Sequence, residues 1–245
     1  MSFIHLRSHS AYSLLKGAIK IPKLIALAKA QNMPALGLVD HDNLFGSLEF
    51  SESAVKEGIQ PILGITLSLV PFGQATHGAG NARTQPDQLL LYAKDETGYA
   101  NLLQLASKAY TAPALGTAPL TDYATLGQHS DGLIALTAGL EGGFGKMLLA
   151  NRTSDASLCL KMLHEMFGDR LYIELTRHSL GDEKLIERAQ IDAALAHNIP
   201  LVATNNIYFA DKSMVEAHDA LLCVADGRYV TETDRPRMNE HHRFK

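Results

Sequence analysis

Apolar residues along this chain form two recurring patterns, short continuous runs and longer stretches with helical spacing. Residues 35–39 (ALGLV) are apolar at every position, which is typical of a strand buried on both faces of a sheet. Within 156–167, apolar residues recur at spacings of three and four, which predicts an amphipathic helix. The same reasoning predicts strands at 3–9, 35–39, 61–70, 89–93, 132–137, 171–175 and 200–203, and helices at 21–33, 44–56, 98–110, 142–150, 156–167, 182–197 and 214–225.

Two stretches between these elements carry turn-forming residues instead of a periodic pattern. Residues 73–86 are rich in glycine and short polar side chains, and residues 111–131 contain two Ala-Pro pairs and several glycines. This composition predicts a surface loop over the first stretch and a long irregular excursion over the second.

Strands and helices alternate six or seven times, with no run of hairpins. This order predicts parallel strands with helical crossovers, in either an open doubly wound sheet or a closed α/β barrel. No G-x-G-x-x-G follows the first predicted strand, which disfavours a dinucleotide-binding sheet. Polar residues follow the strands at 40–42, Thr137, 176–178 and 204–206, and a barrel would collect them at one end, so the barrel is favoured.

Composition bears on the number of domains, on nucleic-acid binding and on the cellular compartment. The 245 residues suit one large domain, and a net charge of −4 with a pI near 6.2 provides no general basic field for nucleic acid. Cys159 and Cys223 lie in apolar helical patterns, as buried thiols of a reducing compartment do. No apolar run approaches the length of a membrane span and no secretory leader is recognisable, so we expect a cytoplasmic protein.

The opening stretch 5–9 (HLRSH) contains three candidate functional side chains, His5, Arg7 and His9. Alternate residues of a strand share a face, so His5, Arg7 and His9 would point the same way. Two imidazoles on one face could begin a metal site. Arg7, however, stays protonated and cannot bind a metal ion.

Several longer motifs carry a resemblance to a known family. They are HLRSHSAYSLLKG (5–17), MPALGLVDHDNLFGSLEF (33–50), GIQPILG (58–64), AKDETGYANLLQL (93–105), DGLIAL (131–136), IPLVATNNIYF (199–209) and AHDALLCV (217–224). In this order they resemble the N-terminal PHP (polymerase and histidinol phosphatase) domain of bacterial DNA polymerase III alpha subunits, over nearly the whole chain. The resemblance implies an α/β fold of the TIM-like type, a distorted seven-stranded (β/α) barrel.

Active members of the wider PHP superfamily are metal-dependent phosphoesterases with a cluster of His, Asp and Glu ligands. The resemblance implies that the family's metal positions fall on Arg7, His9, Lys16, His41, Thr66, Gln88, Gly139, Asn206 and Tyr208, with Asp40 beside them. Of the expected ligands, only His9 and His41 are retained. Since a metal site needs three or four lone-pair donors, we expect no metal, no cofactor and no catalytic residue in this chain.

Two hypotheses follow for this altered cleft. Arg7 and Lys16 could replace the metal charge by pairing with a surviving acid such as Asp40. Alternatively, Arg7, His9, Lys16 and His41 could form a small pocket for phosphate or sulfate. Asp40 could be a cap for the helix beginning near Leu44 or a functional acid, and the cap is the preferred interpretation.

The resemblance also implies a biological role. We expect residues 1–225 to be the barrel domain and 226–245, with Arg235 and His241, to be an exposed linker. This linker would lead to the palm domain of a longer DNA-directed DNA polymerase, which would hold the Mg²⁺. The chain would then be a catalytically silent scaffold, partnered by the proofreading exonuclease subunit and the rest of the polymerase chain, with DNA contacted only through the whole polymerase and no membrane association.

Two other classes of function remain open on the residues. The chain could be a stand-alone PHP phosphoesterase or nuclease with weak activity through His9 and His41, or a phosphate-binding module. His178 is interpreted as a hydrogen-bonded structural side chain. Tyr208 is interpreted as a residue that packs in the barrel, in preference to one that stacks on a nucleic-acid base.

Overall fold

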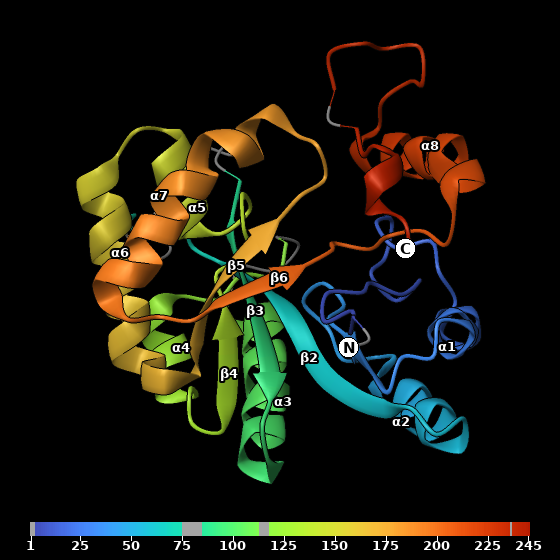
Figure 1. Cartoon of the computed structure of the whole chain (residues 1–245), viewed down its shortest axis with the longest axis horizontal. Coiled ribbons are helices and arrows are strands. Elements are labelled where there is room, and N and C mark those ends of the chain that lie inside the picture. The colour runs from blue at the N-terminus through green and yellow to red at the C-terminus, as the bar shows by residue number, and fades with distance from the viewer. Residues whose placement is uncertain (1–2, 75–84, 113–117, 236) are drawn as a thin grey trace. The chain divides into compact units, whose positions relative to one another are not determined.

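A computed structural model describes residues 3–74, 85–112, 118–235 and 237–245. The chain divides into two compact units. The first comprises Met1–Leu63 and Thr204–Lys245, and the second Gly64–Ala203. Hydrogen-bonded neighbours in the sheet follow chain order from β1 to β6 (Figure 1). The predicted loop over 73–86 lies largely outside the described residues.

In the first unit, strand β1 (Ala35–Leu38) pairs in parallel with the beginning of β2 (Gln60–Leu69). The opening segment lies along the other edge of β1, since the Gly37 N–H donates to the His5 carbonyl at 2.7 Å. A Cβ on Gly37 would lie 2.2 Å from the Leu6 carbonyl oxygen, so only glycine permits this approach. The opening segment also forms a parallel bridge between Ser8 and Ile207. The opening segment therefore lies where an additional strand of the sheet would lie, but it is not a regular strand. The described residues form six regular strands, one fewer than the seven expected.

The helices of the first unit are α1 (Ile21–Ala30), α2 (Ser47–Lys56) and α8 (Val215–Asp226), with short 3-10 turns at Lys212–Met214 and Glu240–His242. The apolar faces of α1 and α2 pack with β1 around one core, because leucine, isoleucine and phenylalanine recur on the inward side of these elements. This core includes Leu24, Leu36, Phe50, Ile207 and Phe244.

The expected linker packs into the same core. Phe244 is 5% exposed, and its N–H donates to the Phe209 carbonyl at 3.0 Å. Arg235 forms a bidentate ion pair with Asp219 of α8, and its side chain is 2% exposed. The prediction of an exposed segment is therefore wrong for Arg235 and for residues 242 and 244, because polar composition does not reveal these anchors. The domain boundary at residue 225 stays a prediction.

In the second unit, β3 (Asp87–Ala93) lies between the end of β2 and β4 (Leu133–Leu136), and runs antiparallel to both. Strand β5 (Leu171–Thr176) returns to a parallel pairing with β4, and β6 (Leu201–Thr204) follows β5 in the sheet order. The prediction of uniformly parallel strands is therefore wrong at β3. The described residues between β2 and β3 contain no crossover helix, and strands joined without one pair antiparallel.

The helices of the second unit are α3 (Glu96–Thr111), α4 (Tyr123–Gln128), α5 (Gly143–Leu149), α6 (Thr153–Phe167) and α7 (Gly181–His197), with a 3-10 turn at Gly168–Arg170. Figure 1 shows α5, α6 and α7 side by side at the left. Helix α4 lies within the stretch expected to be irregular, and Asp122 caps it by accepting from the Thr125 N–H. A six-residue helix is too short to leave a periodic signal, so the sequence prediction missed it.

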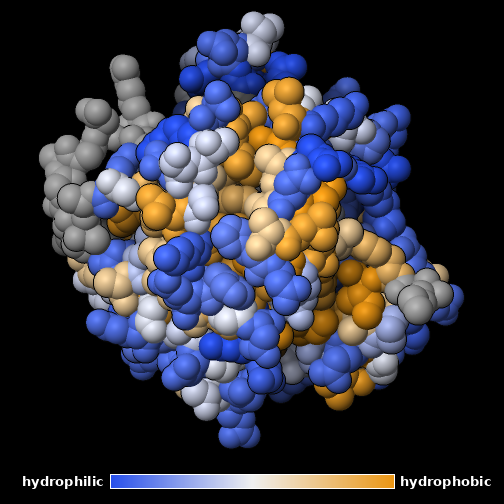
Figure 2. Space-filling model, turned by 60° about the vertical axis from the view of Figure 1, so that its left-hand side comes forward, coloured by the Kyte–Doolittle hydropathy of each residue, from blue (hydrophilic) through white to orange (hydrophobic). Residues whose placement is uncertain are grey.

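The surface of these helices is mixed in character. Figure 2 shows one face that is largely hydrophilic, with hydrophobic residues gathered toward its middle. Among exposed apolar side chains, Leu158 lies on α6, and Leu185 and Leu195 lie on α7. None of the helices that the structure describes is both long and apolar enough to span a bilayer.

Candidate functional site

Asp40 anchors a tight turn that follows the opening segment. Its carboxylate accepts hydrogen bonds from the Ser10 N–H at 2.7 Å, the Ser10 hydroxyl at 2.7 Å and the Ser13 hydroxyl at 2.6 Å. Burial raises the pKa of Asp40, and these hydrogen bonds oppose that rise. Ser13 and Ser10 are the hydrogen-bonding groups that act on the pKa of Asp40, and the pairing with Arg7 and Lys16 stays a prediction. Helix α2 begins after Gly46 without a side-chain cap, so the prediction of Asp40 as its cap is wrong.

Three aromatic side chains stack at the centre of the first unit. The His9 ring lies 4.6 Å from His41 and 4.4 Å from Tyr208, with interplanar angles of 18° and 15°. His9 Nε2 lies 2.8 Å from Asn206 Oδ1, and His41 Nε2 lies 3.0 Å from the Tyr208 hydroxyl. We call His9, His41, Tyr208, Asn206 and Lys16 the imidazole cluster. The structure thus brings together five of the predicted positions.

Lys16 supplies the positive charge of this cluster. Its Nζ lies 3.5 Å from His41 Nδ1, and its carbonyl accepts a hydrogen bond from His218 Nε2 at 2.7 Å. The Asp40 turn carries Lys16, because the Lys16 N–H donates to the Ser13 carbonyl and Ser13 is held by Asp40. An ammonium group can only donate, so His41 Nδ1 accepts and His41 Nε2–H donates to Tyr208.

The electrostatics keep both imidazoles of the cluster neutral. Burial, followed by the charges of Arg7 and Lys16, lowers the pKa of His9 well below its usual value. Burial also lowers the pKa of His41, with further contributions from His9, Lys16 and Arg7. Arg7 itself is 1% exposed. Neutral imidazoles beside fixed cations are suited to hydrogen bonding and stacking, whereas a proton or metal ion would meet repulsion.

Three of the positions that the resemblance pointed to, Thr66, Gln88 and Gly139, belong to the second unit. Thr66 is buried on β2 opposite Leu90, and Gln88 lies on β3 opposite Ser68. Gly139 has a positive φ of 54° and follows β4. A Cβ on Gly139 would lie 3.8 Å from Glu174 Oε2, so a buried carboxylate is next to this position. The sequence prediction did not single out Glu174.

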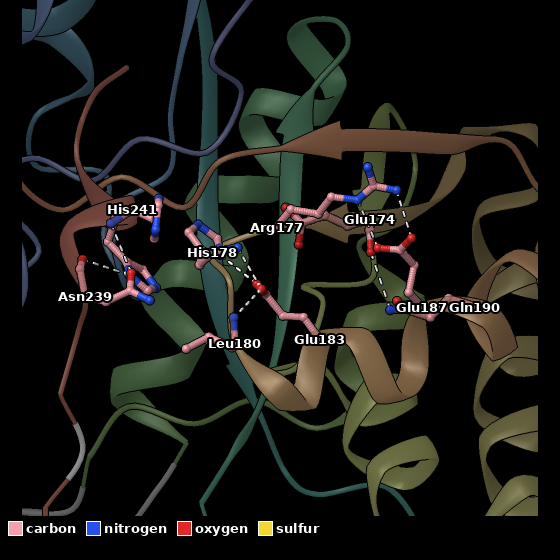
Figure 3. A network of polar contacts seen from close by, with 10 residues as sticks. Glu174, Arg177, His178, Leu180, Glu183, Glu187, Gln190, Asn239 and His241 are labelled. Atoms are coloured by element: carbon pink, nitrogen blue, oxygen red, sulfur yellow. Dashed lines mark hydrogen bonds and ion pairs between the residues drawn. The ribbon is translucent and has the colours of Figure 1, made fainter.

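His178 belongs to a second polar arrangement, which Figure 3 shows around α7. Its Nδ1 lies 2.7 Å from Glu183 Oε1, while the backbone N–H groups of His178 and Leu180 donate to Glu183 Oε2. Burial alone would raise the pKa of Glu183, but the hydrogen bonds and charge of His178 outweigh it and lower the pKa to about 2. The prediction that His178 is hydrogen-bonded is confirmed, and its structural role stays a prediction.

The sequence prediction missed three residues that support the imidazole cluster. Ser10 and Ser13 bind Asp40, and His218 is 2% exposed and holds the Lys16 carbonyl. The serines lie three residues apart directly after the opening segment, a spacing that allows both to serve one acceptor. His218 lies on α8, some 200 positions from Lys16, so only the folded chain reveals it.

The donor set in the first unit is a poor fit for a divalent cation. Lys16 occupies the ring lone pair of His41. Of the two rings it is His9, whose Nε2 donates to Asn206 Oδ1, that offers Nδ1 as a lone pair with no hydrogen-bond partner among the described residues. The carboxylate of Asp40 already accepts three hydrogen bonds from Ser10 and Ser13. Within the residues placed by the structure, no group of three or more His, Cys, Asp or Glu side chains has the geometry to hold a metal ion.

Comparisons with known proteins agree on the family. The PHP domain family model matches residues 5–178. The DNA polymerase III subunit alpha of Caulobacter vibrioides is 43% identical over 243 residues, covering 99% of this chain and 21% of that protein. The subunit of the same name from Treponema pallidum is 37% identical over 239 residues, covering 96% of this chain and 20% of that protein. This chain thus spans about a fifth of the length of the curated relatives it matches.

A solved structure is similar in fold. It is that of a suspected metal-dependent phosphoesterase from Bifidobacterium adolescentis, with a TM-score of 0.55 and 12% sequence identity. The alignment covers 83% of this chain and 86% of that one. The likeness supports the α/β fold of the PHP type predicted from the sequence.

Proposed function

The chain belongs to the PHP domain family, and on that premise we propose that it is the amino-terminal PHP region of a DNA polymerase III alpha subunit. The extent of the similarity supports this, because 99% of the chain aligns with about a fifth of a much longer polymerase subunit. DNA synthesis from nucleotides, and the Mg²⁺ it requires, would belong to the rest of such a protein. The whole would act in the cytoplasm, on DNA.

The PHP cleft itself is proposed to be metal-free and catalytically silent. The observation that carries this proposal is the Lys16 ammonium 3.5 Å from His41 Nδ1, where a ligating histidine would present its lone pair to a metal ion. A fixed ammonium supplies the charge without a dissociable ion, and it removes the ligand at the same time. Arg7 adds a second fixed charge that disfavours protonation of both imidazoles.

Elemental analysis tests this proposal directly. The 245-residue chain, purified in the presence of Zn²⁺ and Mn²⁺ and then dialysed, should retain less than about 0.1 metal ion per chain. It should also show no hydrolysis of bis-p-nitrophenyl phosphate above that of a chain denatured by heat. Stoichiometric metal together with hydrolysis that chelators abolish would instead establish a stand-alone phosphoesterase.

A silent domain of this kind is proposed to act as a scaffold. It would brace the rest of the polymerase chain and offer a surface to a proofreading exonuclease subunit. The first unit supports a bracing role, because its last residues are anchored by Phe244 in the core and by Arg235 on α8. Co-purification of the chain with the exonuclease subunit of the same organism, followed by sedimentation analysis, tests the docking. Migration as separate species at micromolar concentration would refute it.

Anion binding is a second candidate, and a specific group favours it. The charges of Arg7 and Lys16 both act on His9 and His41, so two cations beside two neutral imidazoles could attract one small anion. Calorimetry with inorganic phosphate tests this candidate. Heat of binding that disappears in Lys16→Met, and persists in Lys20→Met on the exposed surface, would support it.

A further inference from the structure

Helix α8 is attached to the first unit by few side chains. Of its twelve residues, all of which the structure describes, His218 and Cys223 are the buried ones. Val224, near the C-terminal end of the helix, is 70% exposed. Burial of an apolar face normally holds a surface helix on its domain, and a helix with little buried surface belongs to the part of a fold that opens most easily. The polar contacts of α8 therefore decide whether it stays in place.

One of these polar contacts comes from the segment that follows α8. We call residues 227–235 the terminal segment, which Figure 1 shows as a loop beside the end of α8. Except for Arg235 and Glu232, its residues are exposed. The Arg235 guanidinium pairs with both carboxylate oxygens of Asp219 on α8, and its side chain is 2% exposed. It also donates to the carbonyls of Val230 and Glu232, each at 3.1 Å. Arg235 is therefore a buried anchor that ties an exposed segment to α8.

A second polar contact joins α8 to Lys16. His218 is the neighbour of Asp219 in α8, and its Nε2–H donates to the Lys16 carbonyl at 2.7 Å. On the other side, the Lys16 N–H donates to the Ser13 carbonyl at 2.9 Å, and Lys16 Nζ lies 3.5 Å from His41 Nδ1. The backbone of Lys16 is thus held from two sides. Because His218 and Asp219 are successive residues of one helix, a displacement of α8 also displaces the group that holds the Lys16 carbonyl.

The turn that carries Lys16 is strained and depends on such restraints. Leu15 has a φ of 61°, a left-handed conformation that leucine rarely adopts. Leu15 is also 47% exposed, so burial of its side chain offsets little of this strain. A Cβ on Gly17 would lie 1.9 Å from the Ser10 carbonyl oxygen, so the turn closes tightly after Lys16 as well. Such a turn relaxes when one of the contacts that restrain it is lost.

We propose that the terminal segment acts as a latch that controls the position of Lys16. Arg235 keeps α8 in place through Asp219. Helix α8 in turn holds the Lys16 carbonyl through His218. In the latched state, which the structure shows, the ammonium stays beside His41. When the terminal segment leaves α8, the helix moves outward, the strained turn relaxes and the ammonium separates from the imidazole. This proposal goes beyond the proposed function, because the coupling holds whether or not the cleft binds a metal ion.

Amide hydrogen exchange followed by NMR tests the latch. The 245-residue chain is compared with Arg235→Gln, which loses the ion pair, and with Arg235→Lys, which keeps the charge but loses the bidentate geometry. The matched control is Lys29→Gln, which breaks the exposed ion pair between Lys29 and Glu57 in the same unit. The reporters are the amide hydrogens of residues 16–18, each of which is bonded to a backbone carbonyl. Thermal melting of each variant establishes that it is folded.

Exchange at residues 16–18 should be at least about tenfold faster in Arg235→Gln, because a charged hydrogen-bonding group is lost, and Arg235→Lys should lie between. Lys29→Gln should leave exchange at these residues unchanged. Adding Arg235→Gln to His218→Ala should cause no further acceleration over His218→Ala alone, since the coupling passes through His218.

Three results would each overturn the proposal. They are faster exchange confined to α8, equal acceleration by Arg235→Gln and Lys29→Gln, and additive effects of Arg235→Gln and His218→Ala. If Arg235→Gln does not fold, Arg235→Lys decides the question, and unchanged exchange at residues 16–18 in that variant would refute the latch.

Discussion

Two buried histidine environments in this chain have the same residue type and opposite electrostatics. In the first unit, His9 and His41 face the cations Arg7 and Lys16, and their pKa values are held well below the usual range. In the second unit, His178 faces the carboxylate of Glu183, and the pKa of that carboxyl is lowered to about 2. Burial is the largest cause of the low pKa values of His9 and His41, and the nearby cations add to it, whereas at Glu183 the hydrogen bonds and charge of His178 outweigh burial.

The difference separates two uses of a polar interior. The imidazole cluster contains neutral rings that stack and exchange single hydrogen bonds, so its stability depends on geometry and on staying uncharged. The pair of His178 and Glu183 depends on a charge and shapes the start of α7, where Glu183 also accepts from two backbone N–H groups. Changes in pH and single substitutions should therefore affect the two environments differently.

The largest expected effect concerns the turn beneath the imidazole cluster. Asp40→Ala removes the acceptor of three buried donors and should lower the free energy of unfolding by about 3 kcal/mol, since each unsatisfied buried group is costly. Urea denaturation at pH 7.5 measures this. Asp169→Ala, at an exposed position, is the control and should change stability by less than about 0.5 kcal/mol. Equal effects of the two substitutions would mean that the turn is not what holds Lys16.

The next effect concerns the charged pair of the second unit. Glu183→Gln should lower the free energy of unfolding at pH 7 by about 2 kcal/mol, because a charged acceptor of three hydrogen bonds is lost. A carboxyl with a lowered pKa stabilises the fold above its unfolded pKa of about 4.5, and this contribution disappears as the pH falls toward 2. The difference between Glu183→Gln and the unmodified chain should therefore shrink between pH 5 and pH 2.

Helix α7 provides a matched comparison for that measurement. Glu187 pairs with Arg177, which is exposed at 77% of its side chain, so Glu187→Gln should cost less than about 0.5 kcal/mol at pH 7. Figure 3 shows both carboxylates on the same helix. If Glu187→Gln proved as costly as Glu183→Gln, burial would not be the factor that separates them.

A smaller effect is the acid sensitivity of the first unit. Burial lowers the pKa of His5 to about 4, while a hydrogen bond to the Lys245 carbonyl opposes this. A histidine with a lowered pKa contributes stability above its unfolded pKa of about 6.5, and the contribution is lost as the pH falls from there toward 4. His5→Gln should therefore remove about 1–2 kcal/mol of the stability change between pH 7.5 and pH 5. The exposed His197 is the control, and His197→Gln should leave the pH profile unchanged.

The sequence predicted the elements better than the contacts between them. Continuous apolar runs located β1 and β4, and helical spacing located α6, because burial imposes these patterns directly on the sequence. The predicted direction of β3 was wrong, because strand direction leaves no periodic signal in the sequence. Helix α4 was missed, because six residues are too few to show helical spacing.

For the candidate site, too, the sequence predicted the residues but not the contacts that hold them. The resemblance pointed to His9, His41, Lys16, Asn206 and Tyr208, and the structure brings all five together. It could not indicate that Asp40 is bound by Ser10 and Ser13, or that His218 holds the Lys16 carbonyl. Such contacts depend on the exact path of a turn and on a helix far along the chain, and neither is encoded locally.

The smallest expected effect is also the most direct test of the contrast between the two histidine environments. Lys16→Met removes the ammonium beside His41 Nδ1 but keeps the length of the side chain. Because Lys16 is one of several causes that lower the pKa of His41, after burial and His9, the pKa should rise and yet stay below its usual value. NMR titration of the histidine ring resonances measures this shift, and stability at pH 7.5 should change by less than about 1 kcal/mol. Lys20→Met is the exposed control. An unchanged His41 titration in Lys16→Met would show that burial alone keeps the ring neutral, and the ammonium could then no longer be regarded as the substitute for a metal charge.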